Sequence, residues 1–368
     1  MKVIISGGGT GGHIFPAVSI ANALKRIDPA IEILFVGANG RMEMEKVPAA
    51  GYKIIGLDIQ GFQRKALWKN ILLPVKILKS LLKARSIIRD FKPDAAVGVG
   101  GYASGPLLHA AGRMGIPYII QEQNSYAGIT NKKLGAKAEK VCVAFEGMER
   151  FFPANKLMLT GNPIRKQSVE IEGKREEALT SFGLSPLKKT ILVTGGSLGA
   201  GTLNKSMIAG LQKLISEDVQ LIWQTGKYYY QSLVGQVGEK PHQNVVVLEF
   251  LNRMDYAYAA ADVIISRAGA GTIAELYVVK KPVILVPSPN VAEDHQTKNA
   301  MALVNNNAAI LVKDAVAEEQ LVDKAIGLIK DDLRVAELSN NIGKLALPDA
   351  DVVIAKEVIK IASKGAGR

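Results

Sequence analysis

The sequence contains one cysteine among its 368 residues. A single thiol excludes an internal disulfide framework and any metal site built from several cysteines. Cys142 lies in the apolar run 141–145, which predicts a buried core thiol. Histidine is scarce as well, and the chain has only His13, His109, His242 and His295. Their spacing is not that of metal ligands.

Acidic residues are few relative to basic ones, with 34 Asp and Glu against 46 Lys and Arg, so the net charge is +12. This excess suits an anionic partner: nucleic acid, an anionic membrane surface or a phosphorylated substrate. The sequence shows neither a helix-turn-helix pattern nor a set of stacked aromatic residues beside its basic residues, so no nucleic-acid partner is predicted. Asp349-Ala350-Asp351 follows Pro348 and precedes a helical pattern, which favours helix capping over metal binding. We therefore predict neither a metal nor a cofactor.

Long apolar runs are lacking too. The nearest, residues 95–112, is uncharged, but glycines, Pro106 and His109 interrupt it, so no membrane-spanning helix is predicted. The first residues show no charged segment followed by an apolar one, so we expect no secretory signal and a cytosolic protein, with surface attachment to a membrane left open.

Apolar segments and amphipathic segments alternate along the chain, which predicts parallel sheets covered by helices, with ligands at the carboxyl ends of the strands. The length predicts about two domains. Strands are expected at 2–5, 31–36, 53–57, 95–99, 118–121 and 141–145, then at 190–194, 219–223, 245–248, 263–266, 282–286 and 309–312. The alternation of apolar and amphipathic segments is interrupted between the first six and the last six predicted strands, and we expect a linker near 163–173. The predicted domains are residues 1–163 and 164–345, followed by a C-terminal helix at 346–368 that could pack back on the first domain.

A glycine-rich loop follows the first predicted strand, with five glycines among residues 7–12. Glycine lets backbone N–H groups approach a charged ligand, and the helix expected from Ile14 adds N–H groups and a positive dipole end. This arrangement suits a diphosphate. A turn that merely connects strand to helix is the alternative.

The same loop matches G-x-G-x-x-G through Gly7, Gly9 and Gly12, which by itself would suggest a dinucleotide-binding fold. That fold expects an acidic residue at the end of the second strand to hold a ribose. Here Val36 is followed by Gly37-Ala38-Asn39. A nicotinamide dehydrogenase is therefore the weaker hypothesis.

Two further glycine loops follow strands in the second half, at 195–200 and 267–275. In the latter, Glu275 lies about one helical turn inside a predicted helix. A carboxylate there can accept hydrogen bonds from both hydroxyls of a ribose, while the preceding N–H groups face a phosphate. Alternatively, Glu275 simply sits well in the first turn of its helix. His295 and Gln296 follow another strand and could approach a ligand, although His295 could equally be a helix-start residue.

Residues 98–105 and 121–124 also end predicted strands, so they should lie at the same sheet edge as the first loop and line a cleft.

Between Arg64 and Lys92 the chain has nine basic residues and one acidic residue, Asp90. Lys69, Lys76, Lys79 and Lys83 would share one side of a helix, flanked by apolar side chains. This pattern suits anionic lipid headgroups, and a packed helix with a solvated basic face is the alternative.

Together, these motifs resemble the MurG family, whose members transfer N-acetylglucosamine from its UDP conjugate to lipid I, giving lipid II for peptidoglycan synthesis. The resemblance covers nearly the whole chain and rests on motifs at 8–16, 100–106, 122–124, 161–165, 195–200 and 267–275. It implies a GT-B fold, in which two doubly wound, Rossmann-like domains face a central cleft. It also implies a lipid I acceptor on the first domain and peripheral attachment to the cytoplasmic face of the bacterial inner membrane.

The resemblance further implies which residues bind UDP-N-acetylglucosamine. Carried onto this chain, these are Thr10, Gly11, Gly12, Asn124, Arg165, Ser197, Leu251, Ala270, Gly271, Thr272, Ile273, Ala274, Glu275 and Gln296. The expected reaction is an inverting, metal-independent transfer in which a base removes the acceptor proton as UDP leaves.

His13 is the candidate base or acceptor-orienting group, because it begins the helix beside the first loop. Tyr102 and Glu122 are the second candidates. Family members often carry histidine before Glu-Gln-Asn, where this chain has Gln121, so no base is expected at that position. An isomerase of UDP-N-acetylglucosamine with the same fold is the main rival, and a non-catalytic nucleotide-binding protein is a more distant one.

Overall fold

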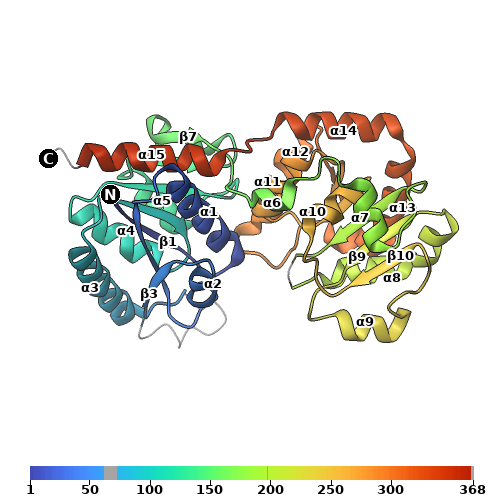
Figure 1. Ribbon diagram of the computed structural model, residues 1–368, viewed down its shortest axis with the longest axis horizontal. Coiled ribbons are helices and arrows are strands. Elements are labelled where there is room, and N and C mark those ends of the chain that lie inside the picture. Colours follow the sequence, from blue (N-terminus) through green and yellow to red (C-terminus); the bar gives the residue numbers. More distant parts are fainter. Residues whose placement is uncertain (62–72, 197, 366–368) are drawn as a thin grey trace. The chain divides into compact units, whose positions relative to one another are not determined.

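The computed structural model describes residues 1–61, 73–196 and 198–365. The chain divides into two compact units, Met1–Ile164 with Leu347–Arg368, and Arg165–Ala346. Each unit is a parallel sheet covered by helices, as the alternation of segments predicts (Figure 1).

The first unit is built on a sheet of seven strands in the order β3-β2-β1-β4-β5-β6-β7, and all its pairings are parallel. Its strands are β1 Lys2–Gly7, β2 Glu32–Ala38, β3 Lys53–Leu57, β4 Ala95–Gly100, β5 Tyr118–Glu122, β6 Lys140–Val143 and β7 Leu157–Leu159. Strand order reverses between β1 and β4, which makes their carboxyl ends the topological switch point.

Helices cover both faces of this sheet because the central strand alternates its side chains. Val3 and Ile5 pack with α1 (Gly11–Ile27), whereas Ile4 packs with α3 (Leu73–Phe91) and α4 (Ser104–Arg113). The unit also contains α2 (Glu43–Ala49) and α5 (Ile129–Gly135). Cys142 is buried in the core, as predicted, and its burial raises the pKa of the thiol to about 12.

The C-terminal helix α15 (Ala350–Gly365) belongs to the first unit and lies along α1 (Figure 1). Ile354, Val358 and Ile361 are buried in the same core as β1. Asp351 lies inside the first turn of α15, where its carboxylate pairs with Arg26 of α1. The expected capping role is therefore replaced, for Asp351, by an ion pair between elements from opposite ends of the chain.

The second unit contains a six-stranded parallel sheet in the order β10-β9-β8-β11-β12-β13. Its strands are β8 Thr190–Thr194, β9 Gln220–Gln224, β10 Val245–Leu248, β11 Val263–Ser266, β12 Val283–Leu285 and β13 Ile310–Leu311. The helices are α6 Lys166–Val169, α7 Arg175–Phe182, α8 Gly201–Ser216, α9 Tyr230–Val237, α10 Met254–Ala260, α11 Ala270–Val279, α12 His295–Val304, α13 Ala317–Lys330 and α14 Asp332–Lys344.

The structure contains two short elements, α6 and β7, that the sequence does not predict. The expected linker at 163–173 contains helix α6, which packs against α10 and α11. Strand β7 was not expected, because its three residues are partly or largely exposed and give no strong apolar signal.

Candidate active site

The loops that follow β1 and β4 meet at the switch point of the first sheet. Gly8 N donates a hydrogen bond of 3.2 Å to Gly100 O, so the two loops are directly joined. A Cβ on Gly101 would lie 2.4 Å from Gly8 O, so only glycine allows this approach. The expectation that these two glycine segments share one edge is confirmed.

The first loop leads directly into helix α1. Gly9 has φ +85°, a left-handed conformation that glycine adopts without strain. Thr10 is extended at the N-cap, its carbonyl accepts from His13 N and Ile14 N, and its side chain makes no capping hydrogen bond. The first N–H groups of α1, on Gly11 and Gly12, therefore lie at the sheet edge, where a helix favours negative charge.

His13 lies in the first turn of α1 and is half-buried. Its Nδ1 is 3.0 Å from Gly8 O and 3.3 Å from Thr10 Oγ1. A carbonyl oxygen can only accept, so Nδ1 carries the hydrogen, and the neutral ring then holds its lone pair on Nε2. The ring lies against Gly100, where a Cβ would come within 2.8 Å of Nε2. This tautomer is the one that a base acting through Nε2 requires.

Glu43, at the start of α2, is a residue that the sequence did not reveal. It is 1% exposed, and its Oε2 accepts from Gly9 N at 2.8 Å while Oε1 accepts from Ala38 N at 3.0 Å. Its carboxyl group fills the space that a Cβ on Gly8 would need. The one hint in the sequence was that no acidic residue follows β2 directly. The acidic residue comes instead from the next helix, α2, where Glu43 binds the backbone of the glycine loop.

Tyr102 and Glu122, the second candidates for a base, have very different surroundings. Tyr102 is 45% exposed, and its ring packs on Gly61 and lies 5.7 Å from the Arg41 guanidinium. Glu122 is 2% exposed and accepts from Asn131 Nδ2 at 2.8 Å, Gly128 N at 3.0 Å and Asn124 N at 3.2 Å. These contacts support a role for Glu122 in ordering the segment between β5 and α5, and the start of α5, rather than in accepting a proton from a substrate.

Two residues expected at the donor site lie together in the second unit. Arg165 Nη2 is 3.8 Å from Glu275 Oε1, and the Tyr258 hydroxyl donates to Glu275 Oε2 at 2.9 Å. Burial raises the pKa of Glu275, while the Arg165 charge and the hydrogen bond from Tyr258 oppose that rise. Glu275 is the sixth residue of α11, which begins at Ala270 directly after the glycine segment.

The other expected donor residues are placed as follows. Ile273, Ala274 and Leu251 are buried, so they would offer a ligand their backbone rather than their side chains. Gln296 lies at the start of α12, and its Oε1 accepts from Ser288 N at 2.8 Å. Ser197 lies outside the described residues, while Ala270, Gly271, Thr272 and Asn124 are half-buried.

A buried polar network shapes the second glycine loop. Thr194 Oγ1 donates to Gln224 Oε1 at 2.7 Å and accepts from Gly196 N at 3.3 Å, and Gln224 Nε2 donates to Gly196 O at 3.0 Å. These hydrogen bonds hold the backbone of Gly196, at the end of β8, in one position, as the start of a phosphate-binding loop would need.

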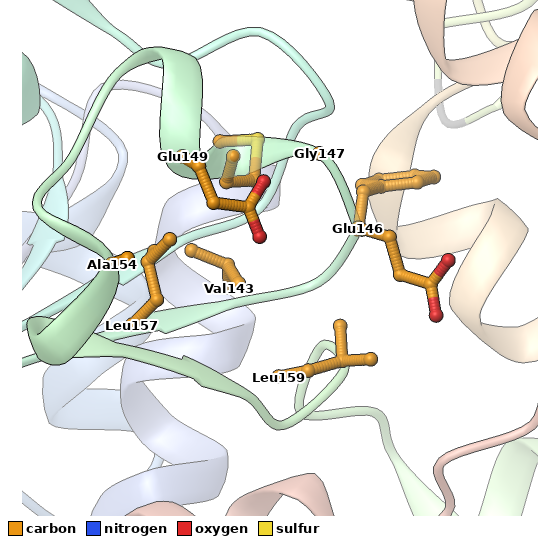
Figure 2. Close-up of a pocket in the computed structure, with 9 residues that line it drawn as sticks. Val143, Glu146, Gly147, Glu149, Ala154, Leu157 and Leu159 are labelled. Atoms are coloured by element: carbon orange, nitrogen blue, oxygen red, sulfur yellow. The ribbon is translucent and has the colours of Figure 1, made fainter.

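A hollow of about 520 Å³ lies elsewhere in the first unit, beside β6 and β7 (Figure 2). Val143, Glu146, Glu149, Leu157 and Leu159 are among its lining residues. No residue predicted for the donor site or for catalysis lines it.

Helix α3 carries an apolar and basic surface in its described part. Val75, Ile77, Leu78 and Leu82 are between 40% and 61% exposed, with Lys79 and Lys83 exposed on the same helix. Lys76 is half-buried and donates to Gln60 Oε1 at 3.1 Å. Lys69 of the predicted basic row lies outside the described residues.

Within residues 1–61, 73–196 and 198–365, no group of three or more His, Cys, Asp or Glu could hold a metal ion. In the same part of the chain, no helix is long and apolar enough to cross a membrane.

Comparison with known proteins gives full-length matches. Residues 3–143 match the glycosyltransferase family 28 N-terminal domain, and residues 190–353 match the family 28 C-terminal domain. A Bacteroides fragilis protein named UDP-N-acetylglucosamine--N-acetylmuramyl-(pentapeptide) pyrophosphoryl-undecaprenol N-acetylglucosamine transferase is 61% identical over 99% of this chain and 96% of its own length. A Flavobacterium psychrophilum protein of the same name is 51% identical over 98% of this chain and 97% of its own.

Solved structures confirm the expected GT-B architecture. Acinetobacter baumannii MurG has a TM-score of 0.80 at 29% identity, covering 98% of this chain and 99% of its own. A UDP-GlcNAc 2-epimerase from Neisseria meningitidis has a TM-score of 0.68 at 15% identity, covering 98% of this chain and 100% of its own, a likeness of fold alone. The family 28 domain matches and the full-length identity lead to the same assignment as the glycine loops and their order along the chain. The chain belongs to the MurG family within glycosyltransferase family 28.

Proposed function

We propose that this protein transfers N-acetylglucosamine from its UDP conjugate to the muramoyl sugar of a pyrophosphoryl-undecaprenol lipid, converting lipid I to lipid II in peptidoglycan synthesis. The observation that carries the proposal is the 61% identity, over 99% of the chain, to a protein named as this transferase. The epimerases share the fold at 15–17% identity, which gives no support to an isomerase activity here.

His13 is the proposed base. The acceptor hydroxyl gives its proton to Nε2, its oxygen bonds to C1 of N-acetylglucosamine, and the bond between C1 and the phosphate oxygen breaks with its electron pair leaving on UDP. This single displacement inverts the configuration at C1. The support is the Nδ1 hydrogen bond to Gly8 O, which leaves the lone pair of the neutral ring on Nε2.

The donor contacts are proposed unit by unit. In the second unit, Arg165 would balance charge on the diphosphate and Glu275 would accept from the ribose hydroxyls, with N–H groups at the start of α11 facing a phosphate. Ser197, Leu251, Ala270–Ala274 and Gln296 complete the proposed set there. In the first unit the proposed contacts are Thr10, Gly11, Gly12 and Asn124.

Peripheral attachment to an anionic membrane surface, at the cytoplasmic face of the inner membrane, is also proposed. On α3, Ala84, Ile87 and Ile88 are buried in the core, while Leu78 and Leu82 are 59% and 61% exposed. Exposed leucines beside exposed lysines suit the boundary between lipid headgroups and acyl chains.

The proposed reaction is tested by incubating the protein, with a chelator present, with labelled UDP-N-acetylglucosamine and a lipid I analogue. The label should enter the lipid in a β-linkage, because inversion converts the α-linked donor, and UDP release should depend on the lipid. Release of UDP or epimerisation of the sugar without any dependence on the lipid would contradict the transferase.

The base is tested by His13→Gln. Loss of general base catalysis should lower kcat by about 10²- to 10⁴-fold, with a smaller effect on KM for either substrate. His109→Gln, on the exposed side of α4, is the matched control and should leave kcat unchanged. Near-normal turnover by His13→Gln would remove the base role and return attention to Tyr102.

The membrane surface is tested by the pair Lys79→Glu and Lys83→Glu. Each basic residue near an anionic surface contributes about 1 kcal/mol, so losing two should weaken binding to vesicles containing anionic lipid by roughly 30-fold or more. Lys205→Glu with Lys324→Glu changes the charge equally on exposed sites of the second unit and should bind like the unaltered protein. Equal binding by both pairs would mean that α3 carries only a solvated basic face.

A further inference from the structure

We propose that Glu43 is a positioning residue for His13 and acts through the peptide group between Gly8 and Gly9. The inference rests on the proposed base role of His13. Glu43 need not touch a substrate in this arrangement, because it works on the far side of a backbone amide.

One peptide group makes both hydrogen bonds. Its N–H, on Gly9, donates to Glu43 Oε2 at 2.8 Å, and its carbonyl, on Gly8, accepts from His13 Nδ1 at 3.0 Å. The peptide group is planar, so fixing the N–H end also fixes the direction of the carbonyl oxygen. The carboxylate therefore determines where the Nδ1–H of His13 finds its acceptor.

Glu43 is itself held firmly. Its second oxygen accepts from Ala38 N at 3.0 Å, and the residue is 1% exposed. Its side chain also occupies the space next to Gly37, where a Cβ would lie 2.6 Å from Glu43 Cγ. A buried carboxylate with both oxygens engaged cannot turn away from the loop without leaving two backbone N–H groups unpaired.

The glycines of the site are explained by this arrangement. A Cβ on Gly8 would come 2.2 Å from Glu43 Oε1, one on Gly100 would meet the His13 ring at 2.6 Å, and one on Gly101 would lie 2.4 Å from Gly8 O. The three glycines therefore make room for the three groups that the hydrogen bonds connect in series. These are the Glu43 carboxylate, the peptide group between Gly8 and Gly9, and the His13 imidazole.

The series has a chemical consequence. A hydrogen bond to a carboxylate is stronger than one between neutral groups, and hydrogen bonds in a chain polarise one another. The Gly8 carbonyl thus becomes a better acceptor for Nδ1–H and holds the tautomer with the Nε2 lone pair. When Nε2 takes the acceptor proton, the same carbonyl stabilises the imidazolium, and no proton crosses the peptide group. A carboxylate performs this task directly in the Ser-His-Asp triad.

The test compares Glu43→Gln with Glu45→Gln, two residues along in the same helix. Glu45 is a solvent-exposed carboxylate paired with Lys46. Glutamine at 43 keeps the shape but leaves one of the two N–H groups without an acceptor, so kcat should fall about tenfold or more, with KM for both substrates within about threefold. Glu45→Gln should match the unaltered protein.

Nitrogen-15 NMR of the four histidine side chains gives a readout independent of activity, with His13 assigned by the loss of its signals in His13→Gln. The unaltered protein should show His13 protonated at Nδ1 with a downfield proton, and Glu43→Gln should move that proton upfield or populate the other tautomer. An Nε2–H tautomer in the unaltered protein overturns the proposal, even if Glu43→Gln does not fold. The same kcat and His13 signals in both glutamine variants also overturn it. If His13→Gln keeps its activity, the base role fails, and the NMR result still decides the link to Glu43.

Discussion

Parallel pairing of β1 with β2 on one side and β4 on the other is the constraint on which the first unit's site depends. In this register Ile5 lies beside Phe35 and Val97, and Gly7 lies beside Gly100 after a shift at Ser6. All three strands therefore end at one edge, and the loops that leave them meet there. The bond from Gly8 N to Gly100 O continues the pairing beyond the regular strands.

The backbone of the first loop then has two functions. Its glycines let neighbouring groups approach closely, and one of its peptide groups joins a buried carboxylate to the imidazole proposed as the base. A glycine-rich loop of this kind is usually considered as a cradle for phosphate. Here one of its N–H groups, on Gly9, is already engaged by Glu43, which leaves the N–H groups of Gly11 and Gly12 at the helix start for a ligand.

Much of the fold could be predicted because buried parallel strands are short apolar runs bounded by glycine or polar residues. Residues 53–57, 245–248 and 263–266 form strands with the bounds that the sequence predicts. Strand β7 and helix α6 were missed for a physical reason. Each has only three or four residues, so neither shows a periodicity, and tertiary packing determines its conformation.

The site was predictable where strands end in glycines, which located the loop at 7–12 and its partner at 98–105. Glu43 could not be found in this way, because its place in the site depends on a hydrogen bond from Gly9, which lies 34 residues earlier in the chain. The burial of Glu122 was equally hidden, since two of its donors come from the loop that follows it and the third, Asn131, comes from helix α5. Sequence patterns give the chemical groups of a site, whereas the hydrogen bonds formed on folding decide which groups are left to react.

The central claim is that His13 receives the acceptor's proton. The most direct measurement is a crystal structure of the protein with UDP and an unreactive muramoyl acceptor analogue bound. The account predicts that the acceptor hydroxyl lies about 2.6–3.2 Å from His13 Nε2, with Nδ1 still bonded to Gly8 O. A hydroxyl bound instead to Tyr102 or Glu122, with the His13 ring turned away, would contradict it.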